Sequence, residues 1–410
     1  MVNHKAASAQ LTILLTLKGR HLFTLRWLWH ASRIGLPFRI FIADGDVHPT
    51  IARLIEDRSV FPNLLIEYHR YNDRTYSDFY QKLNDAFSQI ATPYVMMADN
   101  DDFLFPSGIV RSLEYLERSS DYVCAGGGVA HFETEDEKKE YSNLSGTIEK
   151  LWYQQSKAYQ SFDLDNSLAS ERVLDVYAGS YTVHYNVYRL EALRCIASEQ
   201  VKYNFSRLES SELFWKLRTA TLGKLKSDPS CISYFRQRGT SLNPVQKHDF
   251  INILSASAYL DEIQMVGKSI ASNIAQTDHI DADIIEEELD KRATERLREQ
   301  LIQVLGWRAG VRRYFKKYLP ELLFHRLRLV GDRIRSGKSS ATGGRPISRE
   351  QMFKLMREVG ASEEFVNEQR SELAEIETTL QGREVLAFIH RHASELFMQK
   401  QDSLSGSACR

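Results

Sequence analysis

The chain has 410 residues, of which 43% are hydrophobic and 26% are charged, a composition typical of globular proteins and not of disordered ones. This length is too great for one compact core and predicts two or three domains. The net charge of -1 excludes polyanion binding through bulk electrostatics, so we expect no nucleic-acid partner.

The first half of the chain alternates short apolar runs with helical patterns. Leu11–Leu17 predicts a buried strand, and residues 21–34 carry apolar side chains at helical spacing. Alternation of this kind implies a largely parallel sheet with helices on both faces, an α/β fold. Further strands are predicted over 38–43, 64–69 and 93–98, and further helices over 76–90 and 106–118.

Polar clusters follow three of the predicted strands, at residues 18–20, 44–46 and 99–102. Ligands of open parallel sheets bind outside the carboxyl ends of the strands. All three clusters fall at such ends, and their coincidence predicts a binding site there more strongly than any one cluster does.

The strand pattern fades after about residue 250. Residues 283–305 predict a charged helix, and Ser348 with Gln351 forms a capping box that opens a further helical region, with Ser362 as a second N-cap. We therefore divide the chain into an α/β domain over 1–250, a helical region over 251–338, a linker over 339–347 and a C-terminal all-α region over 348–410.

Residues 307–338 are strongly basic, since ten Lys or Arg face only Glu321 and Asp332, a local charge of +8. Apolar side chains form one helical stripe in this segment. A basic amphipathic helix predicts docking on an anionic membrane surface, as a peripheral protein on the inner face of the cell membrane. The alternative is that the stripe packs on the α/β domain while the charges are solvated.

The cysteines indicate a reducing environment. All four are far apart and form no CxxC pair, which argues against a zinc site or a disulfide framework and favours a cytoplasmic protein. The apolar run 11–17 is too short for a signal peptide and is followed at once by Lys18 and Arg20. No apolar stretch approaches the roughly 18 residues that a membrane span needs.

The acidic segment at 99–102 has the chemistry of a metal site. Transfer of a sugar from a nucleotide diphosphate leaves a diphosphate with extra negative charge, which a divalent cation offsets. Mg²⁺ and Mn²⁺ take hard oxygen ligands, and Asp99 and Asp101, one residue apart at a strand end, can supply them. The alternative is a solvated acidic turn.

Four separated parts of the chain carry motifs that stand in order: TILLTLKGR at 12–20, IADGD at 42–46, MADNDDF at 97–103, and the pair LESSELFWKL at 208–217 and YFRQRGTS at 234–241. Together these motifs resemble the GT-A-fold glycosyltransferases of family 2, the group that builds bacterial surface polysaccharides. The resemblance covers roughly residues 11–245 and predicts a GT-A fold, Rossmann-like, with a mostly parallel mixed sheet and flanking helices. Four matches in order are far more specific than any single one.

For the donor, the resemblance implies contacts from the three strand ends. Thr16 would lie against the nucleotide base, and Asp44 would accept the imide N–H of that base, although an Asp-Gly pair is also an ordinary turn. Asp99 and Asp101 would contact ribose and metal, with Asp102 beside them as a further metal ligand. The expected cofactor is Mg²⁺ or Mn²⁺, and the expected donor is a UDP-sugar.

Cationic and amide side chains are the candidates for the phosphates and the donor sugar. Lys82 and Asn84, on the helix before the fourth strand, could face either group, although a lysine there is more often solvated. Arg20 could bind phosphate or simply cap the following helix. Arg238 stands where the family has a histidine; it cannot ligate a metal but can hold the leaving diphosphate, together with Arg236.

The catalytic base lies where this sequence departs from the family's pattern. The family's acidic pair is Glu209-Ser210 in this sequence, so Glu209 could act as base, or Glu212 one helical turn further on. The base would take the acceptor proton during a single in-line attack, which inverts the anomeric configuration. His184 could line the acceptor site or be an ordinary core histidine.

These features predict a metal-dependent, inverting glycosyltransferase that acts on a glycan or lipid-linked acceptor in surface polysaccharide assembly. The alternative from another class is a catalytically silent nucleotide-sugar-binding or scaffold protein, which Ser210 would suit. A nucleotidyltransferase fits less well, because the sequence lacks the Gly-rich loop of those enzymes.

Overall fold

The computed structural model describes residues 9–46, 51–135, 144–153, 163–178, 183–238, 257–305 and 346–393. These residues form a nine-stranded sheet of order β3-β2-β1-β4-β8-β6-β9-β5, with β7 paired to β6. The strands are β1 (Leu11–Leu17), β2 (Arg39–Asp44), β3 (Leu65–Arg70), β4 (Tyr94–Ala98), β5 (Phe103–Leu104), β6 (Tyr122–Thr134), β7 (Ile148–Tyr153), β8 (Val187–Arg189) and β9 (Lys224–Gln237).

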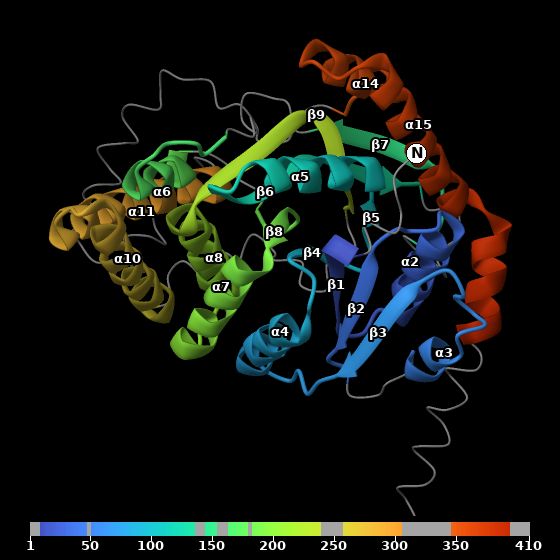
Figure 1. The fold of residues 1–410 in the computed structure, drawn as a ribbon, viewed down its shortest axis with the longest axis horizontal. Coiled ribbons are helices and arrows are strands. Elements are labelled where there is room, and N and C mark those ends of the chain that lie inside the picture. Colours follow the sequence, from blue (N-terminus) through green and yellow to red (C-terminus); the bar gives the residue numbers. More distant parts are fainter. Residues whose placement is uncertain are drawn as a thin grey trace, which may run out of the picture.

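Helices cover this sheet, and further helices lie beyond its two ends (Figure 1). They are α2 (His21–Arg33), α3 (Ala52–Glu56), α4 (Tyr76–Gln89), α5 (Pro106–Arg118), α6 (Ala169–Ala178), α7 (Leu190–Tyr203), α8 (Leu208–Leu222), α10 (Ser257–Asp278), α11 (Ala282–Leu305), α14 (Arg349–Glu358) and α15 (Glu363–Gln381). The predicted strands and helices of the first 118 residues are confirmed, most of them to within a residue at either end.

Half of the sheet is parallel, as the alternating pattern predicted. Strands β3, β2, β1 and β4 run parallel, with Leu17 opposite Asp44 and Leu15 opposite Ala98. The carboxyl ends of β1, β2 and β4 therefore meet at one edge, and the three polar clusters meet with them. The other half is mixed, because β8 is antiparallel to β4 and β6, β6 is parallel to β9, and β5 is antiparallel to β9.

Both faces of the parallel half are buried, which explains why its strands are apolar throughout. Leu14 of β1 faces a core that includes Leu83 of α4 and Trp215 of α8. Ile13 and Leu15, on the opposite face, belong to a second core with residues of α2 and α5. Alternate residues of a strand point to opposite faces, so one apolar run fills both cores. The α/β class is confirmed.

The C-terminal helices pack on the mixed half of the sheet. Ser348 forms the predicted capping box with Gln351, and the Ser362 hydroxyl accepts from the N–H of Phe365, so both predicted helix starts are confirmed. Apolar residues of α14 and α15 share a third core with Phe103 of β5 and Phe235 of β9. Helices α14 and α15 therefore share a buried core with strands of the sheet.

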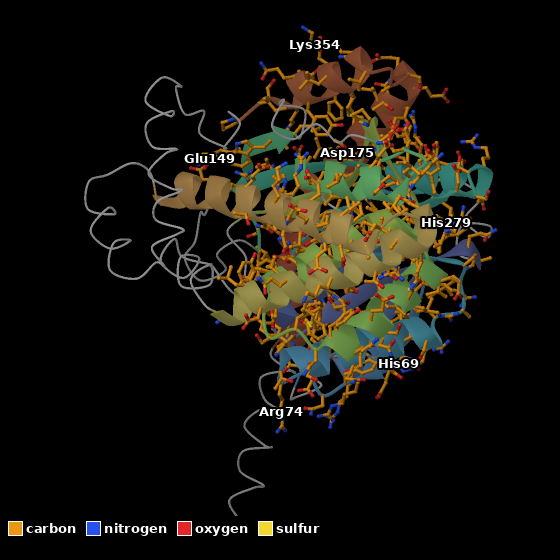
Figure 2. The ribbon with its side chains drawn as sticks, turned by 90° about the vertical axis from the view of Figure 1, so that its left-hand side faces the viewer. His69, Arg74, Glu149, Asp175, His279 and Lys354 are labelled. Atoms are coloured by element: carbon orange, nitrogen blue, oxygen red, sulfur yellow. The ribbon has the colours of Figure 1, made fainter. Side chains whose placement is uncertain are left out.

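At the other end of the molecule, α10 and α11 form a helical hairpin that packs against α6 and α8. This hairpin crosses the face of the molecule seen in Figure 2. The basic segment 307–338, and the linker up to residue 345, lie outside the described residues. Among the residues that the structure describes, no helix is both long enough and apolar enough to cross a membrane.

Candidate active site

The acidic segment of the sequence forms a compact cluster of three carboxylates at the end of β4. One carboxylate oxygen from each of Asp99, Asp101 and Asp102 lies within 4.8 Å of the others. The chain turns sharply here between β4 and β5, so aspartates adjacent in sequence can point to a common centre. The structure thus brings together all three predicted metal ligands.

Two tyrosines and a backbone amide hold this acidic cluster in place. The hydroxyl of Tyr185 donates to Asp99 Oδ2 at 2.7 Å, and the N–H of Asp99 donates to the Tyr234 hydroxyl at 3.0 Å. The two tyrosine rings stack on each other with centroids 4.1 Å apart. On the other side, the N–H of Gln237 donates to Asp102 Oδ1 at 2.7 Å. The cluster is therefore positioned by β9 as well as by its own turn.

The three carboxylates lie close together, and a bound cation would offset their mutual repulsion. Burial raises the pKa of Asp99 and raises that of Asp102 well above its usual range, and the negative charge of Asp101 adds to both effects. Asp102 is only 2% exposed, and its Oδ2 has no hydrogen-bond partner among the described residues. Because an unpartnered buried carboxylate oxygen is costly, the donor set fits a hard divalent cation.

Two arginines, predicted as phosphate ligands, approach this cluster. Arg20 Nη1 lies 2.7 Å from Asp101 Oδ2, so its guanidinium is paired within the cluster. Arg236 lies over the ring of Tyr185, 5.4 Å from its centroid. Burial opposes the charge of Arg236, but Tyr185 and the acids Asp102 and Asp99 together raise its pKa. Both guanidinium groups thus interact with the carboxylates of the acidic cluster.

Arg20 also begins the helix after β1. Gly19 and Arg20 both adopt positive φ, of 70° and 58°, which turns the chain from β1 into α2. The carbonyl of Arg20 accepts from the N–H groups of Phe23 and Thr24 and from the side-chain amide of Asn100. The capping role that sequence alone left open is thus filled by the backbone, while the side chain reaches the acids.

Arg238, the second arginine predicted to hold the leaving diphosphate, lies against β7. Its guanidinium carbon lies 4.1 Å from the centroid of the Trp152 ring on β7, and its N–H donates to the carbonyl of Phe132. Arg236 is the last but one residue of β9, and Arg238 follows directly after the end of that strand.

A second cluster occupies the ends of β1 and β2. Asp44, the last residue of β2, accepts from the Tyr68 hydroxyl at 2.8 Å and from the N–H of Asp46 at 2.9 Å. Burial raises its pKa, although these two hydrogen bonds oppose the effect. Thr16 lies half-buried on β1, next to Ala43 of β2. The predicted base-binding residues are therefore neighbours across two parallel strands.

Lys82 is not the solvated helix residue that its position on α4 suggested. Its ammonium is buried and lies 2.5 Å from Asp73 Oδ2 and 3.3 Å from the carbonyl of Leu17. Burial lowers its pKa, and Asp73 opposes that effect. Asn84 is half-buried two residues further along the helix, about 200° around the axis, so the two side chains cannot face one point.

The two predicted base residues lie on one face of the first turns of α8. Glu209 is half-buried and Glu212 is exposed, and their spacing of three residues makes them neighbours. Although the Glu212 side chain is partly exposed, neighbouring groups crowd its carboxyl group, and this desolvation raises its pKa. The charges of Glu209 and Asp99 add to the effect, and those of Lys216 and Arg236 oppose it. Glu212 is thus close enough to feel the charges of the acidic cluster and its arginine.

Ser210 and His184 both face the interior. Ser210 is fully buried, and its hydroxyl has no partner among the described residues. His184 lies against Trp215 with ring centroids 5.3 Å apart, and burial lowers its pKa to about 3. Its neutral ring suits the core-histidine alternative better than acid–base work.

Sequence reasoning missed Tyr185, Tyr234 and Asp73. Tyr234 opens the YFRQRGTS segment, so its place in a motif was a usable indication. Nothing local in the sequence marks Tyr185 or Asp73, because their partners are 86 and 9 residues away.

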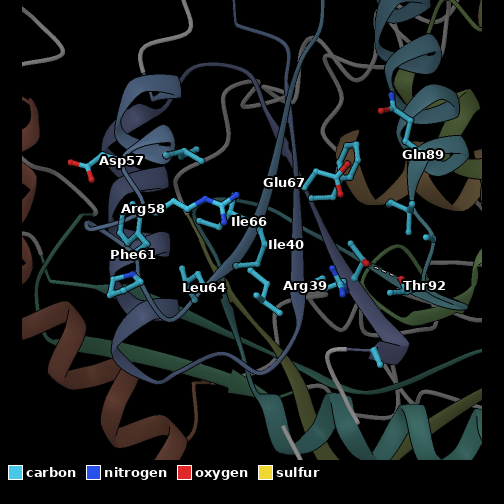
Figure 3. Close-up of a pocket in the computed structure, with 18 residues that line it drawn as sticks. Arg39, Ile40, Asp57, Arg58, Phe61, Leu64, Ile66, Glu67, Gln89 and Thr92 are labelled. Atoms are coloured by element: carbon cyan, nitrogen blue, oxygen red, sulfur yellow. Dashed lines mark hydrogen bonds between the residues drawn. The ribbon is translucent and has the colours of Figure 1, made fainter. Parts of the chain in front are cut away.

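The residues at the opposite edge of the sheet line a hollow of about 680 Å³ (Figure 3). It is lined by the amino ends of β2 and β3 and by the residues after α4, including Arg39, Leu65 and Thr92. We do not assign it as the active site, because ligands of such sheets bind at the carboxyl ends, where the acids cluster.

No protein-family model matches the chain, and no curated protein sequence matches it. Similar solved structures include the crystal structure of S. aureus TarS 1-349, with a TM-score of 0.43, 10% identity and coverage of 90% of each chain. The same protein in complex with UDP-GlcNAc has the same values, and its complex with UDP has 11% identity with the same TM-score and coverage. At these TM-scores the similarity supports no functional assignment, which rests on the geometry of the site.

Proposed function

We propose that the chain is a metal-dependent, inverting glycosyltransferase that uses a nucleotide-diphosphate sugar. The observation that carries this proposal is the carboxylate cluster at the end of β4, with its buried and unpartnered Asp102 Oδ2 and with Arg20 and Arg236 beside it. Paired acids and cations at the carboxyl edge of a parallel sheet suit a metal–diphosphate ligand.

The donor would lie along this edge. Thr16 and Asp44 would contact the base, with UDP as the proposed carrier, and Asp99 would contact the ribose. Asp101 and Asp102 would hold Mg²⁺ or Mn²⁺, which supplies Lewis-acid stabilisation of the leaving diphosphate. Arg236 would bind that diphosphate, which develops negative charge as the glycosidic C–O bond breaks.

Glu212 is our choice for the catalytic base. The acceptor hydroxyl oxygen attacks the anomeric carbon from the face opposite the diphosphate, and Glu212 takes the hydroxyl proton as the new C–O bond forms. Desolvation raises the pKa of Glu212, which makes it a stronger base than an ordinary carboxylate. Ser210 is fully buried, so its hydroxyl is not accessible to an acceptor that binds from solvent.

Several finer proposals complete this picture. Lys82 would act indirectly, by holding the ends of β1 and α4 that border the donor, and Asn84 and Arg238 would border the sugar and the diphosphate. The acceptor would be a glycan or lipid-linked hydroxyl in surface polysaccharide assembly. The basic segment 307–338 would dock on anionic lipid at the inner face of the membrane.

The experiment is donor hydrolysis and transfer, measured with a panel of UDP-sugars in the presence of Mn²⁺. Asp102→Asn should lower turnover at least about 100-fold, because it removes a charged metal ligand. Asp283→Asn, the same change at an exposed site on α11, is the matched control and should keep full activity. Full activity of Asp102→Asn would refute the metal assignment.

The identity of the base has its own test. Glu212→Gln should lower kcat by roughly 100- to 10,000-fold, while Glu209→Gln should have a much smaller effect. The silent-binder alternative is favoured if the wild-type protein binds a UDP-sugar with Mn²⁺ but neither transfers nor hydrolyses it.

A further inference from the structure

Helix α15 contacts the start of α5 through the half-buried carboxylate of Glu372. The N–H and the hydroxyl of Ser107 each donate to the side chain of Glu372 at 2.7 Å. The residue that precedes α5, Phe105, supplies no side-chain cap. The first N–H groups of a helix lack partners within it, and Glu372 of α15 accepts from one of those N–H groups of α5.

A glutamine one turn earlier on α15 joins this contact to β9. The side chain of Gln369 is fully buried; it accepts from the N–H of Ile232 at 2.8 Å and donates to the carbonyl of Ile232 at 2.9 Å. It also donates to the Ser107 hydroxyl at 2.7 Å. One amide therefore connects the backbone of β9 to the first turn of α5.

Both of these elements adjoin the acidic cluster. Helix α5 begins four residues after Asp102. Strand β9 supplies the Tyr234 hydroxyl that accepts from the N–H of Asp99, and the Gln237 N–H that donates to the Asp102 carboxylate. The distance between β9 and the start of α5 therefore affects how Asp99 and Asp102 meet the groups of β9 that bond to them.

Close backbone packing makes this spacing sensitive to the clamp that Gln369 and Glu372 form. A Cβ added at Gly108 would lie 1.9 Å from the carbonyl oxygen of Ile232, so α5 lies directly on β9. The Thr379 hydroxyl of α15 also bonds His30 at 2.7 Å, and the His30 ring meets Phe103, the residue after Asp102, edge-on at 4.9 Å.

We infer that Gln369 and Glu372 of the C-terminal helix are positioning residues for the metal-binding carboxylates, which makes the region after residue 346 a required part of the donor site. This inference rests on the proposed metal-binding function. It explains why the polar side chain of Gln369 is fully buried in this helix contact, where leucine would pack at lower cost.

The test uses the full-length protein and Mn²⁺ alone, with the dissociation constant read from the electron paramagnetic resonance signal of free Mn²⁺. Gln369→Leu and Glu372→Ala should each weaken Mn²⁺ binding roughly 10- to 100-fold, the usual effect of losing an outer support of a metal site. Glu372→Gln still accepts from the Ser107 N–H and should keep the wild-type constant. Leu373→Ala, a buried apolar change on the same helix, is the control for general loosening.

A second readout is hydrogen exchange at the Gln237 amide, which reports the support itself without any metal. Exchange there should accelerate in Gln369→Leu and Glu372→Ala but not in Leu373→Ala. Unchanged Mn²⁺ binding and unchanged exchange in both clamp variants would overturn the inference, and so would an equal loss in Leu373→Ala. If wild type binds no Mn²⁺, the proposed function fails, while exchange at Gln237 still decides the positioning role; if Gln369→Leu does not fold, the Glu372 pair decides.

Discussion

Replacement of Lys82 by methionine tests whether this residue supports the fold or binds the donor. The side chains of Lys82 and Asp73 are 1% and 3% exposed, and the ammonium lies 2.5 Å from the carboxylate. Among the described residues, Asp73 also pairs with Lys18, at 3.5 Å, but the side chain of Lys18 is 54% exposed. Lys82→Met therefore leaves a buried carboxylate with one weak, solvated partner.

The expected cost follows from that geometry. Removal of one partner from a buried ion pair lowers the free energy of unfolding by about 3–5 kcal/mol, because the remaining charge is uncompensated. Lys18 still offsets part of the charge of Asp73, so we expect the lower end, about 3 kcal/mol. The double variant Lys82→Met with Asp73→Asn removes the orphaned charge and should recover at least about 1 kcal/mol of that loss.

Urea unfolding followed by circular dichroism measures these differences by linear extrapolation. Nucleotide affinity, measured on protein that remains folded, is the second readout. A loss below about 1 kcal/mol for Lys82→Met, or a double variant as unstable as the single one, would refute the structural role. Normal stability with lost nucleotide binding would instead make Lys82 a direct donor ligand.

Three further predictions concern the same edge of the sheet, the clamp and the thiols. Gly45→Ala should lower the free energy of unfolding by roughly 1–3 kcal/mol, since the added Cβ would lie 2.3 Å from Cβ of Asp73; equal urea midpoints would contradict this. Burial raises the pKa of Glu372 from 4.5 to about 7, so the folded state binds the proton more tightly than the unfolded state. As the pH rises from 4.5 to 7, the free energy of unfolding of the wild type should therefore fall by up to roughly 3 kcal/mol relative to that of Glu372→Gln. Parallel curves of stability against pH for the two proteins would contradict this prediction. Burial also raises the pKa of both the Cys124 and the Cys231 thiol, so a thiol reagent should modify them only after urea unfolding, and rapid labelling of the native protein would contradict their burial.

The candidate site was partly predictable because its acids follow strands that sequence periodicity identifies. A parallel arrangement brings the ends of β1, β2 and β4 to one edge, so the strand pattern alone predicts that Asp44 and Asp101 lie near each other. The sequence did not reveal which cations would reach the acids. Arg20 pairs with Asp101 across 81 residues of chain, and Lys82 turns instead to Asp73.

The sequence by itself determined the elements, because strand and helix periodicity, caps and turns depend on residues only a few positions apart. Capping boxes such as Ser348 with Gln351 are of this local kind. Only the tertiary structure decided that α15 would cap α5 and brace β9, because Gln369 meets Ile232 across 137 residues and Glu372 meets Ser107 across 265. Contacts of that separation leave no periodic trace in the chain, so the support of the acidic cluster by the C-terminal helix could be found only from the fold.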